Sequence, residues 1–300
     1  MIKTGTIIKG IAGFYYVDVG GHVYECKARG AFKNLKLKPT VGDKVDIELY
    51  ENDIKSGIVI NIHERINHFQ RPSVANIEQF VVVSSLADPK PNLLVVDRFI
   101  AVAEVHGVDV VICFTKSDLV SEDDITYMND IYSGTYPVVF LDMTQENAIK
   151  DLIPYLDGKK SALAGPSGVG KSTILNALKK RVNAQHDKVE TGAVSDKTKR
   201  GRHTTRHVEL FSMDFGGAVF DTPGFTSFDA PDVPEAQLQE LYPDISRYRE
   251  LCKFKGCRHL NEPDCAVRAA VKSGQIHEKR YISYVSQLKE LQEREKKRYL

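Results

Sequence analysis

A glycine-rich segment carries the residue types that bind phosphate. Residues 165–172 read GPSGVGKS and fit the pattern G-x-x-x-x-G-K-S. A strand-like run at 161–164 precedes the segment and a helical pattern at 173–180 follows it, which is the context that a P-loop requires. In such a loop, glycines let backbone N–H groups turn toward phosphate oxygens, Lys171 reaches the β- and γ-phosphates, and the Ser172 hydroxyl binds Mg²⁺. The alternative is a glycine-rich turn that only caps a helix.

We predict that the phosphates of a nucleotide contact this loop and the first turn of the helix after it. The predicted contacts are Gly165, Pro166, Ser167, Gly168, Val169, Gly170, Lys171, Ser172 and Thr173. Lys171 is also a predicted catalytic residue, since it reaches the β- and γ-phosphates. A P-loop touches only phosphate, so it does not by itself distinguish ATP from GTP.

A second motif has the chemistry to recognise a base. Residues 115–118 read Thr-Lys-Ser-Asp, directly follow an apolar run at 108–114, and resemble the Asn-Lys-x-Asp motif with which GTPases bind guanine. The Asp118 carboxylate can accept hydrogen bonds from N1–H and the 2-amino group of guanine, and adenine offers neither donor. Lys116 would lay its alkyl stem over the base. The predicted base contacts are Thr115, Lys116, Ser117 and Asp118.

The alternative for this motif is a strand-to-helix turn capped by Ser117 or Asp118. A third motif favours the nucleotide site. Residues 221–224 read Asp-Thr-Pro-Gly after a strand-like run at 218–220 and match Asp-x-x-Gly, in which Asp221 holds Mg²⁺ through water and Gly224 senses the γ-phosphate. A plain turn would also use these four residues, but their occurrence together with a P-loop predicts a GTPase.

The order of the motifs is unusual, because the base motif comes before the P-loop, whereas ordinary GTPases place it last. This circular permutation makes the whole chain similar to the RsgA family of ribosome small subunit-dependent GTPases. The resemblance implies hydrolysis of GTP stimulated by the small ribosomal subunit and a role in late maturation of that subunit. The sequence departs from related GTPases at two places: Thr115 replaces Asn, and Asp142-Met143-Thr144 does not match the Ser-Ala-Lys segment that helps hold guanine. Both departures suggest a modest affinity for the base.

A polar segment at 191–206 lies where a mobile switch I is expected. The family resemblance implies that a threonine here binds Mg²⁺; we favour Thr204, with Thr205 as the alternative. Many GTPases orient the attacking water with a Gln just after Asp-x-x-Gly, but this chain has Phe225 there. We hypothesise that the neutral imidazole of His203 positions the water instead, the alternative being a switch or RNA contact.

Four metal ligands fall within 14 residues near the C-terminus. They are Cys252, Cys257, His259 and Cys265. Three thiolates and an imidazole suit tetrahedral zinc, and this spacing matches the RsgA family ligand for ligand. Because four protein ligands leave no open position, we predict one structural Zn²⁺ that stabilises a small domain. Free buried cysteines or a redox site are the alternatives.

These motifs need a multidomain fold to position them. Five short strand-like segments, at 2–9, 14–19, 22–28, 44–50 and 57–62, predict an N-terminal OB-fold β-barrel. Between the third and fourth, residues 27–38 carry five basic residues and no acidic one, together with Phe32 as a candidate stacking residue, so RNA contact and a solvated loop are equally plausible here.

The strand and helix pattern changes beyond this barrel. Strand, helix and strand patterns at 79–86, 93–106 and 108–114 form a βαβ unit and predict a parallel sheet with ligands at its carboxyl end. The strands stop after Pro231, and a helix is expected from about Ile276. We expect an OB-fold RNA-binding domain at 1–66, a circularly permuted α/β P-loop GTPase domain at 67–228, and an α-helical zinc-binding domain at 229–300.

Composition limits the remaining choices. The 300 residues carry a net charge of only +1, yet residues 247–300 hold 14 basic against 7 acidic residues and residues 1–65 hold 10 against 8, so both ends are candidates for a polyanion partner. No apolar run approaches the roughly 18 residues of a membrane helix. We expect a cytoplasmic monomer that binds GTP or GDP with Mg²⁺ and contacts the small ribosomal subunit and its rRNA, and not a membrane. Cys26 and Cys113 are expected to be buried apolar residues.

Two other classes remain open at this point. A P-loop ATPase or kinase is disfavoured by Asp118 and by the absence of a lid or acceptor-base motif. A nucleotide-sensing RNA-binding assembly protein with negligible catalysis stays open because Phe225 cannot position water. Hydrolysis of GTP but not ATP, measured with and without small ribosomal subunits, would separate the three.

Overall fold

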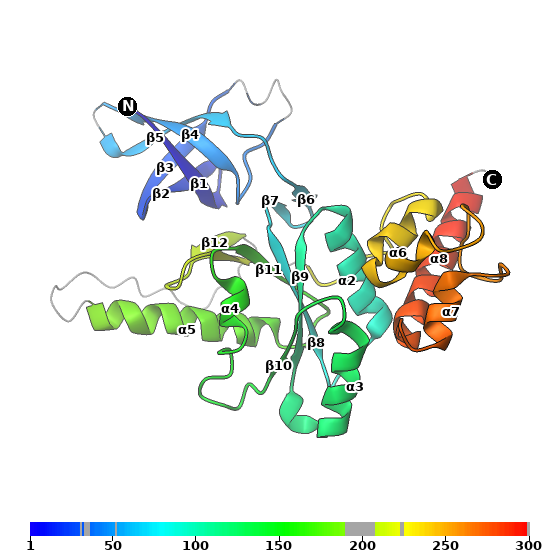
Figure 1. The fold of residues 1–300 in the computed structure, drawn as a ribbon. Coiled ribbons are helices and arrows are strands. Elements are labelled where there is room, and N and C mark those ends of the chain that lie inside the picture. Colours follow the sequence, from blue (N-terminus) through cyan, green and yellow to red (C-terminus); the bar gives the residue numbers. More distant parts are fainter. Residues whose placement is uncertain (31, 33–36, 52, 190–207, 223–224, 299–300) are drawn as a thin grey trace. The chain divides into compact units, whose positions relative to one another are not determined.

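The computed structural model describes residues 1–300 except 31, 33–36, 52, 190–207, 223–224 and 299–300 (Figure 1). The chain divides into two compact units, each made of three segments. Unit 1 holds Met1–Gln79, Ile153–Leu163 and Ser172–Phe225, and unit 2 holds Phe80–Leu152, Ala164–Lys171 and Thr226–Leu300. This division is coarser than the three expected domains, whose boundaries at residues 66 and 228 stay a prediction.

Unit 1 begins with the expected five-stranded barrel. Its strands are β1 (Ile2–Ile11), β2 (Phe14–Val19), β3 (His22–Ala28), β4 (Lys44–Tyr50) and β5 (Asp53–Ile62). β1 pairs with β2, β2 with β3, β3 with β5, β5 with β4, and β4 returns to β1, so the sheet closes. Ile7, Val17 and Ile47 are fully buried inside it. The alternation of buried and exposed side chains explains why the sequence located these strands well.

Beyond the barrel, the described residues of unit 1 form a short hairpin, two helices and three further strands. The hairpin is β6 (His68–Gln70) with β7 (Ser73–Ala75), the helices are α4 (Ile153–Leu156) and α5 (Lys171–Val189), and the strands are β11 (Lys160–Ala164), β12 (Glu209–Ser212) and β13 (Ala218–Asp221). β13 pairs in parallel with β11 and antiparallel with β12. β12 continues to β1 through the register pair Lys9 and Glu209, whose side chains form an ion pair of 3.1 Å.

Unit 2 contains the expected βαβ unit. β8 (Gln79–Ser85), β9 (Asp109–Thr115) and β10 (Val138–Leu141) stand in the order β10-β9-β8, with β9 and β10 parallel. The connections are α2 (Leu93–Val105), the 3₁₀ turn η1 (Ser117–Leu119) and α3 (Glu122–Tyr132). Nearly every residue of β8 and β9 is buried, as expected for strands of a parallel sheet. The side chain of Ser121 forms a capping box with Asp124 that starts α3.

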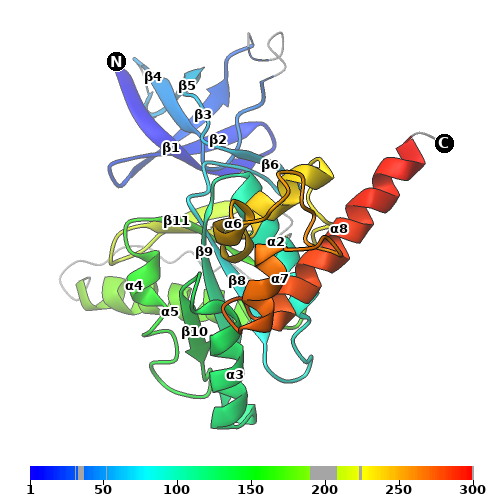
Figure 2. The ribbon, with the colours of Figure 1, turned by 45° about the vertical axis from the view of Figure 1, so that its right-hand side comes forward.

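The C-terminal part of unit 2 is helical, as predicted, and the described residues 231–298 contain no strand. Its elements are η2 (Glu235–Leu241), α6 (Pro243–Arg249), α7 (Ala266–Lys272) and α8 (Glu278–Arg298). Figures 1 and 2 show α8 beside α7 and α2. Leu238, Ile245 and Leu288 belong to the apolar cluster that holds these helices together.

A buried arginine joins this helical part to α2. The Arg280 guanidinium on α8 donates from Nε and NH2 to both carboxylate oxygens of Asp244 on α6, at 3.0 and 3.1 Å, and from NH1 to Asp97 on α2. Its side chain is only 1% exposed, and the ring of Tyr242 lies 4.8 Å from its guanidinium carbon. Three elements distant in sequence therefore meet at one charge.

Two expectations about single residues had opposite outcomes. Cys26 and Cys113 are fully buried, as predicted, and burial raises the pKa of Cys26 to about 11. The expectation that Phe32 is available for stacking on a base is wrong, because the residue is only 8% exposed. Burial of an apolar ring is favourable even in a basic segment, and the sequence does not reveal that the fold buries Phe32.

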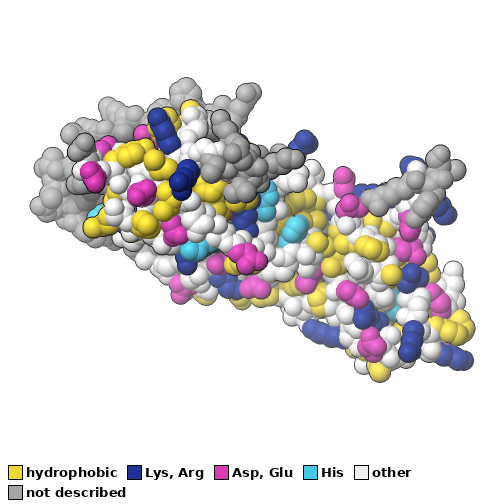
Figure 3. Space-filling model, turned by 90° about the horizontal axis from the view of Figure 1, so that it is seen from above, with side chains coloured by type: hydrophobic (Ala, Val, Ile, Leu, Met, Phe, Trp, Pro, Cys, Tyr) yellow, Lys and Arg dark blue, Asp and Glu magenta, His cyan; other side chains and the backbone are white. Residues whose placement is uncertain are grey.

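Basic and acidic side chains are interleaved on the molecular surface. On the face in Figure 3, Lys and Arg alternate with Asp, Glu and apolar groups. Several C-terminal cations are paired, for example Arg249 with Glu240 at 2.6 Å and Lys253 with Asp264 at 3.0 Å. Part of the charge excess at this end is thus neutralised locally. Among the described residues, none of the helices combines the length and apolar character needed to cross a bilayer.

Candidate nucleotide site and metal cluster

The glycine-rich loop begins where β11 ends at Ala164, and α5 starts at Lys171. Gly165, Gly168 and Gly170 all have positive φ angles, of 149°, 81° and 97°. A Cβ on Gly165 would lie 2.1 Å from the carbonyl oxygen of Val83 in β8, so a side chain cannot be placed there. The loop therefore has the strand, turn and helix geometry that the P-loop pattern requires.

The ammonium of Lys171 stays at this loop. It donates to the carbonyl oxygens of Gly165 and Pro166, each at 2.6 Å. Burial lowers the pKa of Lys171 because desolvation disfavours its charged form. Two carbonyl dipoles offset part of that cost and keep the only ammonium of the loop next to the backbone amides that would bind phosphate.

The base motif lies directly against this loop, within the same unit. Thr115 is the last residue of β9, is buried, and donates its hydroxyl to the carbonyl oxygen of Val169 at 2.7 Å. Its side chain is also 3.4 Å from the position that a Cβ on Gly170 would take. The Thr115 hydroxyl therefore connects the base motif to the phosphate loop, although the sequence has Thr where the motif has Asn.

The other residues of the base motif are placed at the start of η1. Lys116 has a left-handed backbone with φ 59°, and its ammonium donates to the carbonyl oxygen of Asp88. Asp118 is exposed, as a group that binds a ligand must be. The sequence did not reveal the partner Asp88, which lies 28 residues away on the loop after β8.

The segment that departs from Ser-Ala-Lys forms a closed turn after β10. The Asp142 carboxylate accepts from the backbone N–H of Thr144 at 2.9 Å, from its hydroxyl at 2.6 Å and from the Gln145 amide at 2.8 Å. These hydrogen bonds lower the pKa of Asp142. The Asp142 carboxylate thus forms hydrogen bonds within the turn itself.

Oxygen donors that suit Mg²⁺ belong to unit 1. Ser172 is exposed in the first turn of α5, and Asp221 is the last residue of β13. A hydroxyl and a carboxylate are hard ligands of the kind that Mg²⁺ prefers, so this donor set fits the ion. Lys179, which the sequence reasoning missed, pairs with Asp221 at 2.6 Å. It lies eight residues after Lys171, about two helical turns, so helical spacing could have indicated it.

The predicted switch residues His203, Thr204 and Thr205 lie outside the described residues, as does Gly224. Phe225 is described and fully buried. Its ring meets the edge of Phe69 with centroids 5.5 Å apart. Phe225 is thus a packing residue at the position where many GTPases have Gln.

The four predicted zinc ligands lie together in unit 2. One ligand atom from each of Cys252, Cys257, His259 and Cys265 lies within 4.8 Å of the others. The sulfurs of Cys252 and Cys265 are 3.9 Å apart, close to the ~3.8 Å edge of a tetrahedron with zinc–sulfur bonds of about 2.3 Å. The group is buried apart from the half-buried Cys252. Its donor set and its dimensions both fit Zn²⁺.

The tautomer of His259 follows from its partners. Its Nε2 is 2.8 Å from the side-chain oxygen of Gln239, while Nδ1 is 3.4 Å from the sulfur of Cys265. Nε2 therefore carries the hydrogen and donates to Gln239, which leaves the Nδ1 lone pair for the metal. Gln239, in η2, was not identified from the sequence because no ligand spacing marks a residue that orients a ligand.

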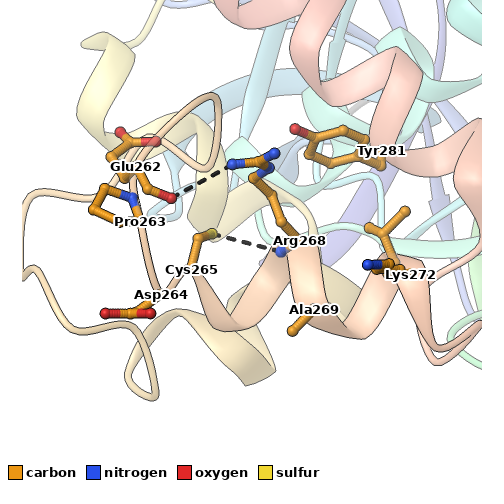
Figure 4. A pocket seen from close by; sticks show the side chains of 9 residues that line it. Glu262, Pro263, Asp264, Cys265, Arg268, Ala269, Lys272 and Tyr281 are labelled. Atoms are coloured by element: carbon orange, nitrogen blue, oxygen red, sulfur yellow. Dashed lines mark hydrogen bonds between the residues drawn. The ribbon is translucent and has the colours of Figure 1, made fainter.

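A pocket of about 430 Å³ lies beside the cluster (Figure 4). Arg268, at the start of α7, donates its backbone N–H to the sulfur of Cys265 at 3.5 Å and its guanidinium to the carbonyl oxygen of Glu262 at 3.5 Å. Burial raises the pKa of the Cys257 thiol to about 12. The Cys257 thiol thus keeps its proton unless a cation displaces it, and Zn²⁺ would do so.

The chain is similar to known proteins over nearly its whole length. A family model described as RsgA GTPase matches residues 62–231, and one described as RsgA N-terminal domain matches residues 4–59. Proteins named small ribosomal subunit biogenesis GTPase RsgA are 43% identical in Alkaliphilus metalliredigens, over 97% of this chain and 98% of that protein, and 40% identical in Caldanaerobacter subterraneus, over 98% of each.

Two solved structures are similar to this chain over nearly its whole length. YjeQ from Thermotoga maritima matches with a TM-score of 0.81 and 32% identity, over 97% of this chain and 99% of that one. YloQ, described as a circularly permuted GTPase, also matches with a TM-score of 0.81, at 34% identity over 98% of this chain and 96% of that one. The permuted order of motifs, the barrel and the Cys₃His cluster agree with these likenesses. This chain belongs to the RsgA GTPase family.

Proposed function

We propose that this chain hydrolyses GTP to GDP and phosphate with Mg²⁺ and acts in the biogenesis of the small ribosomal subunit. The observation that carries the proposal is the 2.7 Å hydrogen bond from Thr115 to Val169, which places the base motif on the phosphate loop. One nucleotide can then meet both motifs. The names of the relatives support the ribosomal role.

The phosphate contacts are assigned to residues 165–173, with Lys171 on the β- and γ-phosphates. Ser172 would bind Mg²⁺ directly and Asp221 would hold it through water, with Gly224 near the γ-phosphate. Mg²⁺, when bound, neutralises charge that develops on the phosphates. The positive φ angles of the loop glycines support these assignments, because they turn N–H groups inward.

Selectivity for guanine is assigned to Asp118, with Lys116 against the face of the base and Ser117 beside it. The exposure of Asp118 supports this role. ATP is disfavoured because adenine would displace water from the Asp118 carboxylate without offering a hydrogen-bond donor in return.

His203 is proposed to position the attacking water and Thr204 to bind Mg²⁺ when the γ-phosphate is present, with Thr205 as the alternative. The burial of Phe225 supports this role for another residue, since the Phe225 ring packs on Phe69 and has no group that could hydrogen-bond to water. Full ribosome-stimulated turnover in His203→Ala would contradict the proposed role of His203.

The partner is proposed to be the small ribosomal subunit through its rRNA, bound by a cytoplasmic monomer. The OB-type barrel supports this, since its basic segment includes Lys27, Arg29 and Lys38. Phosphate contacts would make subunit binding weaken steeply as salt is raised.

The test measures hydrolysis of GTP and of ATP by the purified chain with Mg²⁺, with and without small ribosomal subunits. We expect strong stimulation that is confined to GTP. Asp118→Asn should lose GTP selectivity, because the amide has one acceptor oxygen where the carboxylate has two, and its NH₂ group would face a guanine donor. Stimulation of ATP hydrolysis would contradict the base assignment, and no stimulation at all would favour a nucleotide-sensing protein with negligible catalysis.

A further inference from the structure

Lys179 on the P-loop helix holds the carboxylate that is assigned to Mg²⁺. Its Nζ lies 2.6 Å from Oδ2 of Asp221 and 5.2 Å from the ring centroid of Phe211. All three residues belong to unit 1, on α5, β13 and β12. We propose that Lys179 is a positioning residue that competes with Mg²⁺ for Asp221 and so sets the Mg²⁺ concentration at which nucleotide is held.

The competition follows from the geometry of the carboxylate. A charge-assisted hydrogen bond of 2.6 Å orients Oδ2 toward the ammonium. Mg²⁺ requires near-octahedral geometry and keeps several waters, so Asp221 must turn its oxygens toward those waters to hold the ion. The ammonium, a fixed positive charge close to the same oxygen, also repels a divalent cation. Each cation therefore weakens the binding of the other by the same factor.

The surroundings favour a switchable pair over a permanent one. The Lys179 and Asp221 side chains are 39% and 21% exposed, so both stay accessible to water and the pair can open at low cost. The centroid of the Phe211 ring lies 5.2 Å from the same ammonium, and a cation over an aromatic face remains stabilised after a carboxylate leaves it. Lys179 can thus release Asp221 without being fully exposed.

This inference rests on the proposed role of Asp221 in holding Mg²⁺. Its test is the Mg²⁺ dependence of binding of a fluorescent GDP analogue to the full chain, a readout that needs no hydrolysis. Lys179→Met removes the ammonium and keeps an apolar stem against Phe211, so the half-saturating Mg²⁺ concentration should fall roughly two- to fivefold, the range for an ion pair of this exposure. Lys179→Arg keeps a cation beside Asp221 and should have the wild-type half-saturating Mg²⁺ concentration, called the Mg²⁺ midpoint below.

Arg181→Met is the matched control. Arg181 lies on the same helix and pairs with Asp214 at 3.3 Å, so its loss removes an equal charge without touching Asp221. We expect its Mg²⁺ midpoint to equal that of the wild type. An unchanged midpoint in Lys179→Met, or an equal fall in Arg181→Met, would overturn the competition.

Asp221→Asn separates this inference from the proposed function. If Asp221 holds Mg²⁺, the Asn variant needs more Mg²⁺ than the wild type, and adding Lys179→Met to it brings no further change. If Asp221→Asn leaves the midpoint unchanged, the assignment of Asp221 fails and the competition fails with it. If Asp221→Asn raises the midpoint but Lys179→Met has no effect, only the competition is wrong.

Discussion

The hydroxyl of Thr115 connects the base motif to the phosphate loop. In the Asn-Lys-x-Asp motif the first residue is an amide, whereas here a threonine at the end of β9 reaches the carbonyl oxygen of Val169 at 2.7 Å. The bond is buried, so its loss would leave an acceptor without a partner at a cost of about 1–3 kcal/mol. Its two ends are 54 residues apart, which makes it a direct tie between the base motif and the phosphate loop.

Thr115→Val tests this tie, because it replaces the hydroxyl with a methyl group of similar size. We expect GDP to bind roughly tenfold more weakly, as about 1.4 kcal/mol of loop stabilisation is lost. Isothermal titration of GDP with the full chain measures the effect. Thr115→Ser keeps the hydroxyl and should retain most of the affinity; equal affinity in the Val variant and the wild type would contradict a role for the bond.

At the scale of elements, the conformation of the phosphate loop depends on how closely Gly165 approaches β8. Gly165 lies so near the backbone of Val83 that a Cβ would come within 2.1 Å of a carbonyl oxygen. Gly168 also has a positive φ, but a Cβ there would meet no atom within 4 Å. Gly165 is needed for space as well as for its backbone conformation, whereas Gly168 is needed for its backbone conformation only.

Gly165→Ala and Gly168→Ala therefore form a matched pair. Gly165→Ala should lower the free energy of unfolding by several kcal/mol, since backbone must move to admit the methyl group. Gly168→Ala should cost only about 1 kcal/mol, the strain of a left-handed alanine. Chemical denaturation without nucleotide measures both, and equal losses would show that the close contact with Val83 does not matter.

Zinc binding by the Cys₃His cluster can be tested in the same way, with a matched pair of variants. We expect Cys252→Ser to lose bound zinc, and Cys26→Ser, a matched change of a buried cysteine in the barrel, to keep one ion per chain. Zinc content by elemental analysis decides between the two.

Removal of zinc with a chelator should raise amide exchange in 231–265 while the affinity for GDP stays largely intact. Loss of GDP affinity together with the rise in exchange would argue against separate domains.

Zinc affinity should depend on pH in a defined direction. Burial raises the pKa of Cys257 to about 12 and also raises that of Cys265, so both thiols bind protons at neutral pH in the absence of metal. Zinc must displace these protons, and its affinity should therefore fall as pH is lowered from 8 to 6. Competition with a zinc-binding dye at several pH values measures this; an affinity independent of pH would contradict thiolate binding.

At the scale of the whole molecule, unit 2 contains a buried charged residue, Arg280, whose side chain is 1% exposed. It is enclosed by Asp97, Asp244 and the Tyr242 ring, and so connects α8 to α2 and α6. A buried ion pair adds little net stability when it is complete, but removing one partner leaves a buried charge uncompensated. The Arg280 guanidinium therefore helps to hold the helical part on α2, beside the ion pair of 2.7 Å between Arg98 on α2 and Glu290 on α8.

Arg280→Met should lower the free energy of unfolding of unit 2 by about 3–5 kcal/mol, because Asp97 and Asp244 would remain buried without a cation. Arg249→Met is the control, since Arg249 pairs with Glu240 at the surface and its loss should cost less than about 1 kcal/mol. Denaturant unfolding of both variants checks this; similar costs would mean that the buried network contributes no more than a surface pair.

Features that depend on neighbours along the chain could be predicted from the sequence alone. The P-loop, the zinc ligands and the barrel strands β2, β3 and β4 follow from local spacing and alternation, so their bounds agree with the structure. The order of the motifs along the chain likewise identified the permuted fold. His203 and Thr204 lie outside the described residues and stay predictions.

Features that join distant segments were decided only by tertiary structure. The pairing of Lys179 with Asp221, the support of His259 by Gln239 and the enclosure of Arg280 each join side chains between 20 and 183 residues apart. The burial of Phe32 belongs to the same class. Spacing along the chain carries no information about which of many polar or apolar groups will meet, because that choice is made by packing of whole elements.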